Sequence, residues 1–75
     1  MNNILKIINT VLKNRGKKEV LEINEKSDLR VQIGFDSLDL AELTVRIEAE
    51  YDIDIFQDGI VNTVGEILQK LQNTK

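Results

Sequence analysis

A serine near the middle of the chain stands where a loop is expected to turn into a helix. Ser37 follows Gly34 and Asp36, and a run of residues with helical spacing begins directly after it. Gly34 supplies backbone freedom just before the turn. A serine here is exposed and lies at the positive end of the helix dipole, where free backbone N–H groups favour a phosphate. Ser37 is therefore a candidate for accepting and keeping a phosphodiester.

Ordinary helix capping is the alternative reading of the same residues. An Asp-Ser pair before an apolar helix is a common cap, and either Asp36 or Ser37 could serve as one. Short motifs have a high false-positive rate. The pair alone does not separate a cap from a modification site.

Composition restricts the chemistry further. The chain has no Cys and no His, which excludes disulfides, thiolate or imidazole ligands, and a thiol or imidazole catalyst. Any thioester chemistry must use the thiol of a cofactor. Asp52, Asp54 and Asp58 suggest a calcium loop, but Phe56 and Thr63 stand where ligands belong. We therefore expect no metal site. We also expect no catalytic residue and no enzyme activity, because a paired acid and base would need a cleft and the acidic residues lie along a convex helix.

Three stretches have the apolar spacing of helices that must position these residues. The first covers 3–15 and precedes Gly16, at a place that favours a left-handed residue. The second covers 37–51. The third begins with a capping box, Thr63 to Glu66. The expected core positions are Ile4, Leu5, Ile8, Val11, Leu12, Leu40, Leu43, Ile47, Tyr51, Val64, Ile67, Leu68 and Leu71.

The connections complete the predicted fold. Residues 17–36 show no sustained period, and a loop of this length in a compact domain is usually functional or packed by its own side chains. Residues 20–23 could form a short strand, but no partner strand is apparent. Residues expected to pin the loop are Val20, Leu21, Ile23, Leu29, Val31 and Ile33. With a short third helix or turn at 56–61, the fold class is an all-α bundle of three main helices.

Charge is distributed unevenly. Residues 1–35 carry seven Lys/Arg and four Asp/Glu, whereas 36–58 carry eight acidic residues and one arginine, a balance of -7. This acidic middle repels nucleic acid and favours basic protein partners. No apolar run approaches the ~20 residues needed to span a membrane, and the N-terminus lacks the pattern of a signal peptide. We therefore expect a cytoplasmic location. We also expect the protein to be a monomer.

The segment Gly34-Phe35-Asp36-Ser37-Leu38-Asp39 resembles the G-x-D-S-L-D signature of acyl carrier proteins. The resemblance covers nearly the whole chain. Residues resembling the family's second helix and its exit are Leu43, Ile47, Glu48, Tyr51, Asp52, Ile53 and Ile55.

The resemblance implies one acyl carrier domain over residues 1–75. It implies that a phosphopantetheinyl transferase attaches 4'-phosphopantetheine from coenzyme A to Ser37, within the motif of Gly34, Asp36 and Leu38. Acyl groups would then be carried as thioesters to acyl-transferring and acyl-modifying enzymes.

One face of the second predicted helix is a candidate docking site. Leu38, Ala41 and Val45 share it, at a rotation away from the core stripe. Acidic residues expected to flank it are Asp39, Glu42 and Glu48. Taken alone, this is an ordinary solvated face. The resemblance implies instead that it meets basic patches on partner enzymes. An unmodified adaptor that docks through the same helix is the alternative.

Several positions depart from the usual fatty-acid carrier. Phe35 is larger and Ala41 smaller than the residues often found there, and Phe56 replaces a common proline. The segment 56–63 is about two residues short and contains Gly59. A general fatty-acid carrier and a dedicated carrier, for example in polyketide synthesis, both remain open. Asp36 stands where peptidyl carriers more often have histidine, which favours an acyl carrier.

Overall fold

Apolar periodicity gives each helix a face that it must bury against the others. The computed structural model describes residues 2–57, 59 and 61–72, and it contains α1 (Asn2–Asn14), α2 (Ser37–Tyr51) and α3 (Val64–Gln72). Within these residues no β-strand forms, and the only bridge is an isolated one between Asp28 and Thr63. The predicted all-α bundle is confirmed.

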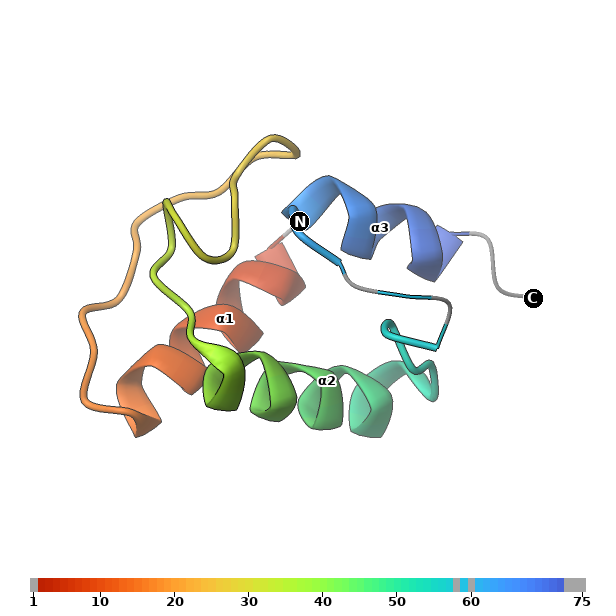
Figure 1. The fold of residues 1–75 in the computed structure, drawn as a ribbon, viewed down its shortest axis with the longest axis horizontal. Coiled ribbons are helices and arrows are strands. Elements are labelled where there is room, and N and C mark those ends of the chain that lie inside the picture. Colours follow the sequence, from red (N-terminus) through yellow and green to blue (C-terminus); the bar gives the residue numbers. More distant parts are fainter. Residues whose placement is uncertain (1, 58, 60, 73–75) are drawn as a thin grey trace.

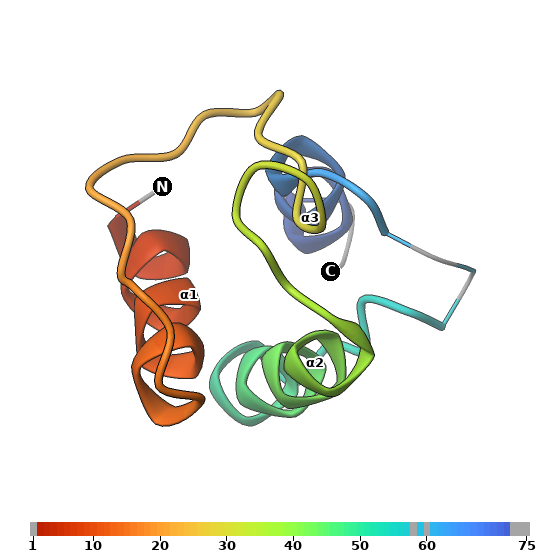
Figure 2. The ribbon, with the colours of Figure 1, turned by 60° about the vertical axis from the view of Figure 1, so that its left-hand side comes forward.

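The three helices surround one apolar core (Figure 2). Helices α1 and α2 approach each other most closely. The buried apolar side chains are Ile4, Ile7, Ile8, Val11, Leu12, Leu29, Ile33, Phe35, Leu40, Leu43, Ile47, Ile55, Val61, Val64 and Ile67. Among the predicted core positions, Tyr51, Leu68 and Leu71 are partly buried at the edge. Leu5 was also predicted but does not belong to the core, whereas Ile7, which was not predicted, is buried there. The sequence pattern thus identified the inward face of every helix.

Helix α1 ends in a left-handed turn that matters for the site below. Gly16 has φ +71°. The N–H of Gly16 donates to the carbonyl of Lys13 (3.1 Å), and that of Lys17 donates to the carbonyl of Leu12 (2.8 Å). These two bonds form a Schellman motif, which satisfies the last helical carbonyls. The turn reverses the chain so that the side chains of Arg15 and Lys17 meet the start of α2.

The long connection runs from α1 to the start of α3 and then returns to α2 (Figure 1). Leu29 and Ile33 are buried, and Val20 and Ile23 pack partly against the core. The predicted short strand at 20–23 does not form. The expectation that Leu21 also pins the loop was wrong, because its side chain is 96% exposed.

Leu21 points outward because hydrogen bonds fix the orientation of its neighbour, Val20. The side-chain amide of Asn9 donates to the carbonyl of Val20 (2.9 Å) and accepts from its N–H (2.8 Å). This two-point contact turns Val20 toward α1, and the next residue of an extended chain faces the opposite way.

Val31, also expected to be a pin, is 84% exposed. It lies in a turn whose N–H groups at Arg30 and Val31 donate to the carboxylate of Asp28 (2.9 and 2.7 Å). Leu29 and Ile33 share the inner side of this turn, so Val31 falls on the outer side.

The loop is tied to the start of α3 by backbone hydrogen bonds. The N–H of Leu29 donates to Asn62, that of Val64 to Ser27, and that of Gly65 to Glu25, at 2.8–3.0 Å. The predicted capping box at α3 is present: Glu66 N–H donates to Thr63 Oγ1, and the Glu66 carboxylate accepts from Thr63 N–H, both at 3.2 Å.

Between α2 and α3 the chain forms a turn at 55–57, and the described residues of this connection contain no further helix. Ile55 is fully buried beneath it, and Phe56 is partly buried. The predicted extra helix or turn is therefore a turn over these residues, and the rest of 56–61 includes positions 58 and 60, which lie outside the described residues. In the part of the chain that the structure describes, no helix is long and apolar enough to cross a bilayer. The cytoplasmic location stays a prediction.

Candidate functional site

The start of α2 is held by a reciprocal pair of aspartates. The Asp36 carboxylate accepts from the N–H of Asp39 (3.0 Å), and the Asp39 carboxylate accepts from the N–H of Asp36 (3.0 Å). Asp36, not Ser37, is the capping residue, which confirms the capping reading for Asp36 and leaves Ser37 as a predicted modification site. Ser37 is the first residue of the helix and is exposed. Capping by Asp36 leaves the Ser37 hydroxyl available for other chemistry.

Asp39 is buried, with an exposed fraction of 0%, although it was expected to flank the docking face. That expectation was wrong. Its carboxylate pairs with Arg15 Nε at 2.8 Å and with Lys17 Nζ at 2.5 Å. A buried carboxylate needs such partners to remain charged. The missed signal was its position three residues after the cap, where an acidic side chain returns to the cap backbone.

The same two cations reach Asp36. Arg15 Nη2 lies 3.2 Å and Lys17 Nζ 3.6 Å from Asp36 Oδ2. The N–H donated by Asp39 lowers the pKa of Asp36 below its usual range, with Lys17 and Arg15 acting in the same direction. Asp36 is therefore ionised at neutral pH beside Ser37. Lys17 also donates to the carbonyl of Gly34 (3.0 Å), so it ties the loop before Ser37 to the end of α1.

The outward face of α2 is exposed as expected. Leu38 is 65% and Val45 63% exposed, and Ala41 and Glu48 are also exposed. Glu42 is half-buried: its carboxylate accepts from Arg46 Nε at 2.9 Å and from the Asn14 amide at 3.3 Å.

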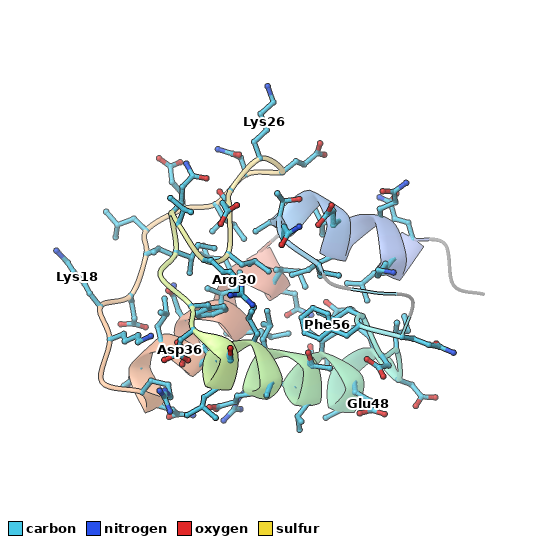
Figure 3. The ribbon with its side chains drawn as sticks, in the orientation of Figure 1. Lys18, Lys26, Arg30, Asp36, Glu48 and Phe56 are labelled. Carbon is cyan, nitrogen blue, oxygen red and sulfur yellow. The ribbon has the colours of Figure 1, made fainter. Side chains whose placement is uncertain are left out.

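Those two hydrogen bonds, that from Arg46 first, lower the pKa of Glu42. The negative charge of Glu42 is therefore partly compensated by contacts within the molecule. Of the three predicted flanking acidic residues, only Glu48 points freely outward (Figure 3).

A shallow groove of about 270 Å³ opens directly beside Ser37. Leu40, Ala41 and Phe56 give it an apolar lining, and Arg30 adds one cation. Leu40 and Ala41 come from the first turns of α2, whereas Arg30 and Phe56 come from the two loops on either side. Sequence analysis did not single out Arg30, since nothing in the loop pattern brings it to Ser37.

No group of three or more acidic side chains that could hold a metal ion occurs at 2–57, 59 and 61–72. Asp58, one of the three aspartates considered for a calcium loop, lies outside the described residues.

Comparison with known proteins gives consistent matches. A family model described as the phosphopantetheine attachment site matches residues 2–71. An acyl carrier protein of Saccharopolyspora erythraea is 38% identical over 50 residues, covering 64% of this chain and 53% of that protein, so the match spans about half of the relative. No solved structure gives a significant match.

Two further relatives match over a larger share of their length. The acyl carrier protein of Trieres chinensis is 34% identical over 56 residues, covering 72% of this chain and 70% of the relative. That of a Sulfurovum species is 35% identical over 54 residues, covering 69% and 72%. The family model spans the motif, all three helices of the fold and the loops between them. With its helical bundle and its exposed serine at the start of α2, the chain belongs to the acyl carrier protein family, whose members are carriers of a covalent 4'-phosphopantetheine rather than enzymes.

Proposed function

We propose that Ser37 is the attachment residue of 4'-phosphopantetheine, and that the chain carries acyl groups and presents them to biosynthetic enzymes. The observation that carries this proposal is the exposed Ser37 hydroxyl at the first position of α2, left uncommitted because Asp36 makes the cap. When bound, the prosthetic group supplies the terminal thiol that forms thioesters, and the chain itself has no cysteine.

The residues around Ser37 fit this group. Ser37 lines a groove whose other walls are largely apolar, and this groove can receive part of a long flexible arm. The serine also lies at a helix N-terminus, where the dipole stabilises a phosphodiester. Ser37 would hold the group covalently, and Leu40, Ala41 and Phe56 would contact it.

The buried Asp39 has a supporting role in this proposal. Its contacts with Arg15 and Lys17 fix the start of α2 against the end of α1. Ser37 is thereby presented on a rigid element rather than on a mobile loop, which favours accurate presentation to a partner's active site. In this proposal the catalytic groups for the transfer lie on the transferase.

We propose that partners dock on the exposed face of α2. Leu38, Ala41 and Val45 supply apolar contact area, and the exposed Glu48 supplies negative charge. Such a surface suits a phosphopantetheinyl transferase and acyl-handling enzymes that carry basic patches, because complementary charge speeds encounter and fixes orientation.

The proposal has two versions, a fatty-acid carrier and a carrier dedicated to another pathway, and they differ in the acyl group that is carried. The curated relatives are named only as acyl carrier proteins. Mass spectrometry of the acyl cargo on protein purified from its native cell distinguishes the two versions.

Intact mass spectrometry tests the attachment site. After incubation with coenzyme A, Mg²⁺ and a broad-specificity transferase, the mass should rise by one phosphopantetheine. Ser37→Ala should abolish the gain. The chain's other serine, Ser27, is buried, and Ser27→Ala should retain the gain. No gain in the wild-type protein, together with partner binding that Ser37→Ala leaves unchanged, would select the unmodified adaptor.

A further inference from the structure

Charge around Ser37 is balanced before anything is attached. Asp36 and Asp39 contribute two negative charges, and Arg15 and Lys17 contribute two positive charges within 2.5–3.6 Å of them. A phosphodiester on Ser37 adds a further negative charge next to the ionised Asp36. The two cations are already committed to Asp36 and Asp39, so they cannot compensate it without weakening the capping pair.

Arg30 is the cation that lines the groove at Ser37. Its backbone N–H donates to the carboxylate of Asp28 (2.9 Å), which fixes the residue in its turn. Its guanidinium has no acidic partner in the described part of the chain. By contrast, Arg15 and Arg46 both pair with carboxylates.

The direction of the side chain agrees with this placement. Arg30 points toward the start of α2, above Asp36 and toward Phe56 (Figure 3). Lys18 and Lys26, which also come from the long loop, extend away from the molecule (Figure 3). Of these three loop cations, only Arg30 lines the groove at Ser37.

We propose that Arg30 binds the phosphodiester of the prosthetic group on Ser37, and that Phe56 covers the adjoining apolar part of the arm in the same groove. This inference rests on attachment at Ser37. A guanidinium suits the role because its planar fork can give two hydrogen bonds to a phosphodiester. The groove thus has a cationic end for the phosphate and an apolar end formed by Phe56, Leu40 and Ala41.

The difference in melting temperature between the modified and unmodified forms tests the proposal. In the wild-type protein, attachment should raise the melting temperature by about 2–4 °C, the scale of an exposed ion pair in a domain of this size. Arg30→Gln should remove the increase, and Arg30→Lys should keep part of it, because lysine retains the charge without the fork. Lys26→Gln removes a loop charge that points away from Ser37 and should leave the increase unchanged.

A second measurement needs no variant. The side-chain Nε–H resonance of Arg30 should shift when the prosthetic group is attached, and 1 M NaCl should reverse most of that shift because salt screens an exposed pair. An Arg30→Gln protein with the wild-type increase, or an Arg30 resonance that does not respond to attachment, overturns the inference. Either result leaves the proposed function standing if the mass gain on Ser37 is intact. Failure to gain the mass overturns both.

Discussion

At the scale of single residues, the proposed function depends on adjacent side chains with different structural roles. Asp36 caps α2 and Asp39 anchors it, so Ser37 between them needs no structural hydrogen bond. The motif could be recognised from the sequence because its residues are adjacent. The cations that complete it could not, because Arg15 and Lys17 are more than 20 positions away and reach Asp39 only through the turn after α1.

Asp39→Asn should destabilise the fold. The variant keeps the size of the side chain and leaves Arg15 and Lys17 without the carboxylate that they share. Removing one partner of a fully buried ion pair costs several kcal/mol. Here the two cations are 32% exposed and solvent screens them, so we expect a loss of about 1–3 kcal/mol.

Urea unfolding of the unmodified protein measures this loss. Glu48→Gln is the matched control, since Glu48 is exposed on the same helix, and it should change the free energy of unfolding by less than about 0.5 kcal/mol. Equal unfolding midpoints for Asp39→Asn and Glu48→Gln would show that the buried carboxylate does not anchor α2.

At the scale of elements, the helices followed from local patterns and the loop did not. The bounds of α2, Ser37–Tyr51, and the capping box of α3 agree with the sequence prediction. Leu21 and Val31 have apolar side chains of the kind found in cores, but hydrogen bonds of neighbouring residues decide the direction in which they point. Asn9 orients the neighbour of Leu21, and a turn around Asp28 turns Val31 outward. Such side-chain to backbone contacts have no period that could reveal them.

Gly65→Ala should destabilise the protein although it replaces glycine inside a helix. Alanine in a helix interior normally gains about 0.5–1 kcal/mol over glycine. A Cβ at Gly65 would lie 2.8 Å from the carbonyl oxygen of Glu25, which is closer than real contacts allow. Because Gly65 N–H also donates to that carbonyl (2.9 Å), the loop would have to move away from α3. We expect a net loss of about 1–2 kcal/mol.

Chemical denaturation and amide hydrogen exchange test this contact together. Exchange should accelerate at the N–H groups of Leu29 and Val64, which form the neighbouring bonds between the loop and the start of α3. Gln69→Ala, at an exposed position of α3, serves as the control and should leave both measurements near wild type. If Gly65→Ala were more stable than wild type, the loop at Glu25 would be able to move away from α3 without a loss of folding free energy.

At the scale of the whole molecule, folding redistributes the charge that the sequence shows. The positive charge of residues 1–35 is partly neutralised, because Arg15 and Lys17 form ion pairs with Asp39 of α2. The acidic excess of 36–58 is reduced in the same way at Asp39, and Arg46 engages Glu42. The charge that remains on the exposed side of α2 is therefore smaller than the sequence suggests and depends more on each residue, Glu48 above all.

Modification of the protein by a transferase should therefore depend on salt and on Glu48. If partners dock on α2 through complementary charge, kcat/KM for phosphopantetheine transfer should fall several-fold between 50 mM and 500 mM NaCl, on the order of the steering effects known for charged partners. Glu48→Gln should lower kcat/KM at low salt by about twofold and flatten its salt dependence, since a rim charge acts mainly on encounter. Glu25→Gln makes the same charge change beside Lys26, which lies at the far end of the molecule from α2 (Figure 3), and should behave as wild type. Equal effects of the two variants would show that the rate depends only on net charge. The proposal that partners dock on the face of α2 that carries Glu48 would then lose its support.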